Sequence, residues 1–542
     1  MLSKSCKHSM YFSMCKIPLG IRLGVLLLSP LTFLSCQHKE PPQNHISLGM
    51  KSDPSSLDPR EVRLLAEINL IKQMYEGLVQ ENPKTKEIEP ALAESYTISE
   101  DKTTYTFHLR KANWSDGSAI TAQDFVDSWK QVVSQEVTGI YAFALFPLKN
   151  AKNIHEGSLP ISQLGCRAID STTLEVVLEK PTAHFLKLLS LPIFFPVHKK
   201  QRSSSPSALP ITSSAFYPEQ IKHHQWLTLK KNPHYYNHNH VQTQTITIHF
   251  IPDANTASLL FNQGKLDWQG PPWGDRIPLE AQPKLKEQGY LKTFDVDATH
   301  WLIFNLQKFP LNHHKLRKAL ALAIDKDAIV ASLFLNSVKP AQHLLPTHIH
   351  SYPEENSQEA AQKKRLAKHL FKEALQELNI SEDTLQTLNL TYSLGGATNL
   401  LLAQMIRNQW KETLGFTLPL EGKEFALLQK DFSTRNFSLS LGNWYADFSD
   451  PMAFLSIFAY PSGISPYAIN HTQFLECLLS IEGEHDPKLR EAFVSQATSY
   501  LENLNILEPI YHDSCLFALN KNFHNLQLSS TGAIDMRYVR EP

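Results

Sequence analysis

Two aspartates near the end of the chain carry the chemistry that residue types and spacing assign most directly. Asp450 directly precedes Pro451, and an aspartate at the N-cap followed by proline at the first helical position is a common start of a helix. Asp447 lies one turn upstream and is not needed for that cap, so its carboxylate is free to bind a partner. Trp444 and Tyr445 precede it, and either these rings wall a cleft or they pack in the core, as aromatic side chains commonly do.

Motifs for covalent catalysis or metal binding are missing from the sequence. It contains no G-x-S-x-G nucleophile elbow, no H-E-x-x-H zinc motif, no Walker A loop and no C-x-x-C pair. The clustered histidines lack the acidic or cysteine neighbours of a metal site, so we interpret them as exposed polar loops. They are His223 and His224, His234, His238 and His240, and His313 and His314. We therefore expect no metal, no cofactor and no enzymatic activity.

The composition is that of a large soluble protein with several domains. The chain has 542 residues, of which 42% are hydrophobic and 19% are charged, and this length favours roughly two to four domains. The net charge of −1 and the lack of a basic block argue against nucleic acid as a partner. Only Cys166, Cys477 and Cys515 follow the N-terminal segment, so at most one internal disulfide can form.

The N-terminus has the features of an export signal. A basic segment, Lys4–Arg22, precedes the apolar run Leu23–Leu34, which is too short to span a bilayer as a stable helix. Ser35 and Cys36 follow, and a cysteine directly after the cleavage site resembles a bacterial lipoprotein signal. We expect residues 1–35 to be a signal peptide, Cys36 to carry lipid, and residues 36–45 to form a tether. The alternative is a soluble exported protein in which Cys36 is incidental.

Hydrophobic periodicity predicts a mixed α/β chain. Apolar side chains alternate with polar ones at Tyr105, Phe107 and Leu109, which indicates a strand, and Thr121 and Asp124 have the spacing of a helix capping box. The other predicted helices cover residues 64–79, 316–324, 358–378, 402–410 and 489–501, and the other strands cover residues 174–178, 226–229, 246–250, 388–392 and 437–441. Ser203–Ser207 is expected to be a surface crossover.

Nine segments, in the same order and with similar spacing, resemble the oligopeptide-binding proteins of ABC importers, which are OppA-type, family 5 extracellular solute-binding proteins. They are Leu57–Pro59 (LDP), Tyr75–Val79 (YEGLV), Pro90–Ser95 (PALAES), Thr106–Arg110 (TFHLR), Trp114–Gly117 (WSDG), Thr121–Phe125 (TAQDF), Phe261–Asp267 (FNQGKLD), Lys315–Leu320 (KLRKAL) and Trp444–Pro451 (WYADFSDP). Each segment alone is weak evidence, but the resemblance extends over nearly all of the chain after the signal peptide.

The resemblance implies a two-lobed periplasmic-binding-protein fold of the class II type, with mixed sheets in each lobe and an extra inserted domain. Domain I would be discontinuous and combine residues 46–88, 201–297 and 510–542. Domain II, residues 89–200, would be the insertion, and domain III, residues 298–509, would be the opposite lobe. The ligand would lie in the cleft between domains I and III.

The resemblance also implies a peptide site. A binding protein for many peptides must hold the backbone and the charged ends, and a buried ammonium needs a carboxylate. We expect Asp447 to hold the ligand's α-ammonium, with Asn443, Trp444 and Tyr445 beside it. The remaining candidates are Tyr141, for the ligand backbone, and Trp301 and Phe425, for pocket walls. Leu441 stands where some members have arginine, so recognition of the ligand's carboxyl terminus is open.

The expected partners are short peptides, the permease subunits of an ABC importer and membrane lipid through the anchor, and the protein is expected to be a monomer outside the cytoplasm, in the periplasm or on the cell surface. Alternatives on the same fold are receptors for murein peptides, dipeptides or nickel. Alternatives from other classes are a secreted hydrolase and a surface adhesin.

Overall fold

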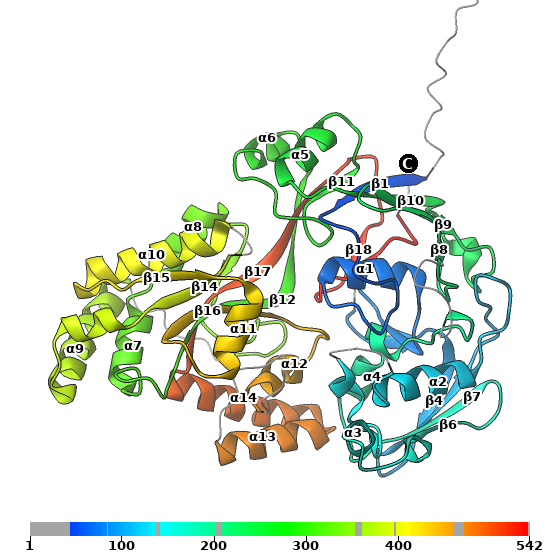
Figure 1. Ribbon diagram of the computed structural model, residues 1–542, viewed down its shortest axis with the longest axis horizontal. Helices are drawn as coiled ribbons and strands as arrows, with labels where there is room; N and C mark the ends of the chain where they lie inside the picture. The colour runs from blue at the N-terminus through cyan, green and yellow to red at the C-terminus, as the bar shows by residue number, and fades with distance from the viewer. Residues whose placement is uncertain are drawn as a thin grey trace, which may run out of the picture. The chain divides into compact units, whose positions relative to one another are not determined.

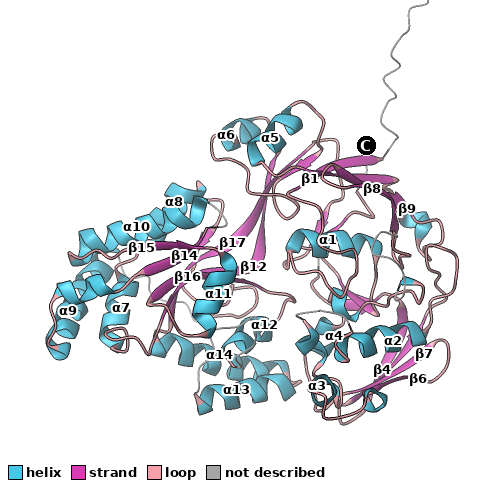
Figure 2. Ribbon diagram, in the orientation of Figure 1, coloured by secondary structure: helices cyan, strands magenta, loops and turns pink. Residues whose placement is uncertain are grey.

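One large mixed sheet runs through the protein, as Figure 1 and Figure 2 show. This computed structural model describes residues 44–83, 85–136, 141–201, 209–352, 360–394, 397–459 and 471–539. The sheet has eleven strands. In spatial order they are β15 (Leu420–Lys423), β14 (Leu390–Ser393), β16 (Leu439–Tyr445), β12 (Leu291–Phe304), β17 (Leu507–Leu519), β11 (Trp268–Gln269), β1 (His45–Met50), β10 (Thr245–Phe250), β9 (Trp226–Lys231) and β8 (Phe216–Lys222), while β13 (Lys339–Pro340) pairs with β17.

The antiparallel strands β12 and β17 join the two ends of this sheet. At one end β17 pairs with β11, and at the other end β12 pairs with β16. The register between β12 and β17 shifts between Asp295 and Thr299, as happens where a bulge lets a strand bend. Residues on either side of this shift therefore belong to differently oriented parts of the sheet.

A separate four-stranded antiparallel sheet is formed by β4 (Ala93–Ile98), β5 (Thr104–Leu109), β7 (Thr173–Val177) and β6 (Cys166–Ala168), in that spatial order. Tyr105, Phe107 and Leu109 are buried on one side of β5, as the alternation predicts. Helix α2 (Ala122–Val133) begins at the predicted capping box, where the Asp124 carboxylate accepts the backbone N–H of Thr121 at 2.9 Å. Two short pairs complete the strands: β2 (Val79–Glu81) with β3 (Ile88–Pro90), and β18 (Gln527–Leu528) with β19 (Ile534–Asp535).

The helices cover the sheets and enclose the cores. They are α1 (Leu65–Met74), α2, α3 (Ala151–His155), α4 (Phe185–Leu188), α5 (Ala254–Asn262), α6 (Gln282–Glu287), α7 (His314–Leu322), α8 (Lys326–Phe334), α9 (Ala360–Leu378), α10 (Ala397–Leu414), α11 (Phe425–Ser433), α12 (Pro451–Leu455), α13 (Thr472–Gly483) and α14 (Pro487–Leu504). Helices α7 to α10 enclose a core of their own against β14 and β16, which includes Trp410 and Phe371. Within the described ranges, none of these helices is long and apolar enough to span a membrane.

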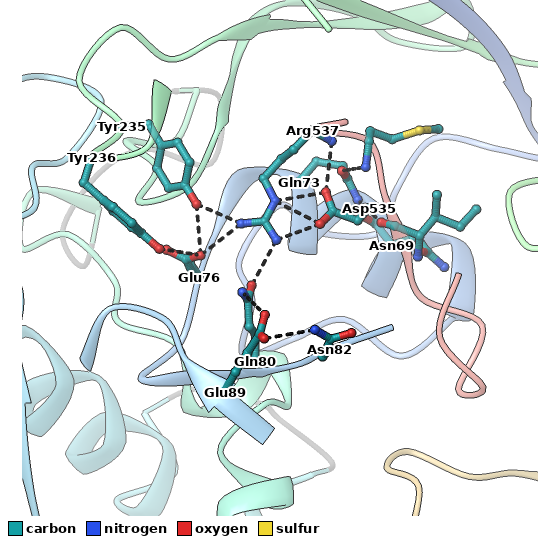
Figure 3. A network of polar contacts seen from close by, with 12 residues as sticks. Asn69, Gln73, Glu76, Gln80, Asn82, Glu89, Tyr235, Tyr236, Asp535 and Arg537 are labelled. Atoms are coloured by element: carbon teal, nitrogen blue, oxygen red, sulfur yellow. Dashed lines mark hydrogen bonds and ion pairs between the residues drawn. The ribbon is translucent and has the colours of Figure 1, made fainter. Parts of the chain in front are cut away.

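The helix predicted over residues 64–79 is shorter than expected. Helix α1 ends at Met74, and Tyr75–Leu78 continue as irregular chain into β2. The reason is visible in Figure 3: Glu76 turns inward and accepts hydrogen bonds from the hydroxyls of Tyr235 and Tyr236 and from Arg537. These contacts join Arg537, near the C-terminus, to the segment that follows α1. The Tyr75–Val79 motif therefore has a structural role.

The predicted signal peptide, Cys36 and the crossover Ser203–Ser207 lie outside the described residues. The three later cysteines are described, and Cys166, Cys477 and Cys515 are all free thiols in buried positions. No disulfide therefore joins any of the described parts of the chain.

Candidate functional site in the β16 segment

The end of β16 and the residues that follow it present a row of polar side chains. Asn443 and Tyr445 are exposed and Asp447 is partly exposed. Because side chains alternate along a strand, Asn443 and Tyr445 point to the same side of β16, and Trp444 points to the other. Asp447 follows the end of the strand. The Trp444 ring packs against the core, and its indole N–H has no hydrogen-bond partner in the described part of the chain. Of the two adjacent aromatic residues, Tyr445 thus lies on the open face.

Hydrogen bonds of neighbouring residues hold the backbone on both sides of Asp447. The backbone N–H of Ala446 donates to the carbonyl of Asp297, in the bulge of β12, at 2.7 Å. On the other side, Asp450 caps α12 as predicted, since its carboxylate accepts the backbone N–H of Met452 at 3.0 Å. Asp447 is therefore held between a strand and a helix start without taking part in either.

Among the described residues, the carboxylate of Asp447 has one partner, the hydroxyl of Tyr141. Tyr141 lies after α2, far from Asp447 in sequence, and donates a hydrogen bond to it. Burial raises the pKa of Asp447 to about 7, and the hydrogen bond from Tyr141 acts in the opposite direction. No lysine, arginine or histidine forms an ion pair with Asp447 within the described ranges. Two of the predicted site residues, Asp447 and Tyr141, are thus brought together around a carboxylate that has no basic partner among the described residues.

One edge of β16 is open beside this face. The parallel partner β14 pairs only with Leu439 and Ser440, whereas β12 pairs along the whole strand to Tyr445. From Leu441 onward, the edge away from β12 has no strand partner among the described residues. The Leu441 carbonyl accepts the Ser440 hydroxyl at 3.1 Å, and an edge without a strand partner can pair with an added strand.

Trp301 and Phe425 are not brought to this face. Trp301 lies opposite Gly442 in the β12–β16 pair, so its ring points to the buried side. It is 1% exposed, and its ring centre lies 6.3 Å from that of Phe458. Phe425 begins α11 and is 64% exposed. Trp301 is thus a core residue in this structure, and Phe425 a surface residue.

A buried charged cluster next to Tyr445 was not predicted from the sequence. Asp513, on β17, is held by Arg276 from the loop after β11, by His300 on β12 and by the Tyr445 hydroxyl. Burial opposes ionisation, but Arg276 and His300 hold the pKa of Asp513 below its usual range. The signal in the sequence was Asp513 itself, which stands with His512 and Ser514 before the apolar end of β17.

Asp450 also has a second function, which sequence reasoning missed. Its buried carboxylate accepts hydrogen bonds from Arg490 on α14, at 2.7 Å, and from Lys187 on α4, at 3.1 Å. Lys187 donates in addition to the carbonyl of Ser449 at 2.6 Å. This cluster therefore joins α4, the β16–α12 connection and α14.

A cavity of about 420 Å³ lies beside this cluster. Its walls include Lys187, His348, Ser449, Arg490 and Glu491, and so carry both signs of charge. Its volume is within the range of ligand pockets. In the described residues, no three histidine, cysteine or acidic side chains are grouped so as to hold a metal ion.

Comparison with known proteins places the chain in a family. Residues 87–466 match the family model of the bacterial extracellular solute-binding proteins, family 5 Middle. Because the match covers well over half of the 542 residues, the chain belongs to this family. It is a solute-binding protein of the extracytoplasmic transport type and not an enzyme, as the sequence predicts.

Individual relatives match along nearly the whole chain. The protein is 26% identical over 504 residues to the oligopeptide-binding protein OppA of Bacillus subtilis (strain 168), which covers 91% of this chain and 92% of that protein. It is 28% identical over 472 residues to the periplasmic murein peptide-binding protein MppA of Escherichia coli (strain K12), with coverage of 85% and 86%.

Solved structures agree in fold. The structure of the Escherichia coli murein tripeptide binding protein MppA matches with a TM-score of 0.78 and 26% identity, over 92% of this chain and 99% of that one. An oligopeptide-binding protein of Borrelia burgdorferi, OppAIV, matches with a TM-score of 0.77 and 25% identity, over 92% and 100%. The predicted two-lobed periplasmic-binding-protein fold is thereby confirmed.

Proposed function

We propose that the protein captures short peptides and delivers them to the permease of an ABC importer. The observation that carries this proposal is the carboxylate of Asp447. It is partly buried, and among the described residues it lacks a basic partner and hydrogen-bonds to Tyr141 alone. A partly buried carboxylate of this kind favours a cationic ligand group, because pairing removes the penalty that burial imposes on its charge. The α-ammonium of a peptide is such a group.

The open edge of β16 supports the same function. A peptide whose ammonium lies at Asp447 can extend along residues 441–447 and pair its backbone with the free edge as an added strand. This pairing uses groups that every peptide has, and it leaves the ligand's side chains to meet the exposed residues Asn443 and Tyr445. Broad acceptance of peptide sequence follows from this division of contacts.

We also propose that the chain is divided into three domains and that the ligand lies in the cleft between domains I and III. Domain I would comprise residues 46–88, 201–297 and 510–542, domain II residues 89–200 and domain III residues 298–509. The shift in register between β12 and β17 at Asp295–Thr299 is consistent with a boundary close to residue 297. We further propose that Cys36 carries the lipid that keeps the protein at the membrane.

Binding of a mixed peptide library to the purified protein tests the function. Ligands that remain bound are identified by mass spectrometry, and the library includes dipeptides, tripeptides, longer peptides and murein peptides, because relatives are named for several of these classes. Recovery of intact peptides with free amino groups is expected. Retention of N-acetylated peptides in equal amount, or of no peptide, would contradict the proposal.

A further inference from the structure

The charged cluster around Asp513 includes Tyr445, which lies two residues before the proposed ammonium site at Asp447. His300 is paired with Asn443 across the β12–β16 ladder, and its ring lies 6.1 Å from that of Tyr445, centre to centre. Tyr445 is two residues before Asp447, so the two side chains project from positions roughly 7 Å apart along the segment. The Tyr445 hydroxyl then reaches the carboxylate of Asp513. This contact places the cluster next to Asp447.

Within this cluster, Arg276 has N–H groups that no described residue accepts. One of its terminal nitrogens, Nη2, donates to Asp513, and its guanidinium lies 5.3 Å from the centre of the Phe334 ring. No other side chain or carbonyl in the described residues accepts a hydrogen bond from it. A guanidinium has five N–H groups, so Nε and Nη1 remain available. The Arg276 side chain is 34% exposed, whereas Asp513 is 2% exposed.

The buried partner fixes the direction of these free donors. The Asp513 carboxylate also receives the backbone N–H of Ser514 at 2.7 Å, so it is anchored on several sides. An arginine held on one side by an anchored carboxylate and on its face by an aromatic ring loses little freedom when it binds a second anion. The exposed side of Arg276 is therefore preorganised for a carboxylate, the group whose geometry a guanidinium matches best.

The charges of Asp447 and Arg276, and the spacing between them, match a short peptide with a positive amino group and a negative carboxylate. Asp447 accepts a positive group, and the donors of Arg276 lie beyond the neighbouring residue of the same row. An extended peptide advances by about 3.3 Å per residue, so a carboxylate one to three residues after the free amino group comes within reach of Arg276. That carboxylate is either the carboxyl terminus of a short peptide or an acidic side chain.

We propose that Arg276 donates hydrogen bonds to a carboxylate of the bound ligand and thereby selects peptides with a carboxylate close to their amino terminus. This inference rests on the proposed peptide-binding function. Arg276 acts on specificity, while Asp513 is a positioning residue that holds it.

Calorimetry with four peptides tests the proposal: trialanine as the free acid and as the amide, and Ala-Glu-Ala amide and Ala-Gln-Ala amide. For the wild type, we expect the acid to bind roughly 10- to 100-fold more tightly than its neutral counterpart in at least one pair. A preference for the acid in the trialanine pair identifies the ligand's carboxyl terminus as the group that Arg276 binds. A preference for Ala-Glu-Ala amide over Ala-Gln-Ala amide identifies the acidic side chain instead. In Arg276→Gln this preference should vanish, while the neutral peptides bind as they do to the wild type.

Two further variants separate specificity from folding. Arg276→Lys keeps the ion pair with Asp513 but loses the planar fork, so it should fold and lose most of the preference. Arg167→Gln is the control, because Arg167 pairs with Glu175 on the surface of the four-stranded sheet, and this variant should retain the preference. If Arg276→Lys weakened the binding of all four peptides equally, the role of Arg276 would be structural and the proposal would be overturned.

The remaining outcomes are also distinguishable. A wild type that binds all four peptides without preference would contradict the Arg276 subsite alone, since the peptide-binding function would stand. A wild type that binds none of them would contradict both.

Discussion

The hydroxyl of Tyr141 donates a hydrogen bond to the carboxylate of Asp447, and these residues come from distant parts of the chain. Tyr141 follows α2, beside the four-stranded sheet, whereas Asp447 follows β16 of the large sheet. The bond therefore links the regions of two different sheets at the point where we place the ligand's amino group. No other residue in the described ranges donates a hydrogen bond to the Asp447 carboxylate.

Replacement of Asp447 by asparagine should abolish the preference for a free amino group. Loss of a buried charge pair typically costs about 2–5 kcal/mol, so we expect roughly 30-fold weaker binding of a free-amine peptide or more. An N-acetylated peptide should bind wild type and variant about equally. Calorimetry on both proteins with both peptides gives the coupling energy. Independent effects of acetylation and substitution would contradict the assignment, and Asp327→Asn, an exposed change in α8, is the control.

Peptide affinity should depend on pH through Asp447. Its pKa in the empty protein is raised to about 7, mainly by burial, and an ammonium ligand favours the ionised form. Binding at pH 6 therefore releases a proton, and affinity should rise about fivefold or more between pH 6 and pH 7.5. Above about pH 8 it should fall again, as the ligand's amino group loses its proton. Calorimetry in buffers of different ionisation enthalpy measures the proton release, which Asp447→Asn should remove.

The same pKa predicts the effect of Asp447 on the empty protein. A carboxyl whose pKa is higher in the folded state than in the unfolded state stabilises the folded state at low pH, and this contribution is lost as the pH rises through about 7. At pH 8 the empty Asp447→Asn variant should therefore unfold at the same urea concentration as the wild type or a higher one. A lower midpoint would show that Asp447 has a structural role.

Tyr141→Phe should shift the pH profile of binding. The hydroxyl of Tyr141 lowers the pKa of Asp447, so its removal should move the midpoint of the profile to higher pH. At pH 6.5 the affinity for a free-amine peptide should fall by roughly 3- to 10-fold, with little change for an N-acetylated peptide. Tyr217→Phe, on β8, should leave the profile in place. An unshifted profile in Tyr141→Phe would mean that the hydrogen bond does not tune Asp447.

Arg490→Met should destabilise the fold. Asp450 is 2% exposed, and removal of Arg490 leaves its buried charge with Lys187 as the remaining basic partner. We expect a loss of about 3 kcal/mol in the free energy of unfolding, measured by urea denaturation at pH 7. Arg365→Met, on the exposed side of α9, is the matched control and should change little.

The pH dependence of this loss identifies its cause. Despite burial, Arg490 and Lys187 hold the pKa of Asp450 below its usual range. The stabilisation is therefore present above the unfolded-state pKa of about 4 and is lost as the pH falls below it. The difference between wild type and Arg490→Met should narrow toward pH 3, and a constant difference would point to packing instead.

Cys36→Ala should release the protein from membranes or block its processing. The mature wild type is expected to begin at Cys36 and to carry acyl chains, which intact-mass spectrometry and membrane fractionation detect. Cys477→Ala, a change at a buried free thiol, should remain membrane-bound. A mature N-terminus elsewhere, without lipid on Cys36, would contradict the lipoprotein prediction.

Local signals in the sequence predicted local structure well. The cap at Asp450 and the capping box at Thr121 depend only on residues within one helical turn, and both form as predicted. The family was also accessible from the sequence, because its motifs are short and keep their order. Helix α1 ends early because Glu76 reaches Arg537 near the end of the chain, a contact that no local window contains.

The sequence by itself determined the class of protein and its cap residues, and it predicted Asp447 and Tyr141 as site candidates. Tertiary structure alone decided which side chains share a face. The strand predicted over residues 437–441 extends to Tyr445, and the register of β12 against β16 sends Trp301 into the core and His300 toward Tyr445. A shift of one residue in register would reverse these directions. The cluster of Arg276 and Asp513 likewise depends on strand pairing across the sheet, so periodicity within any one segment cannot reveal it.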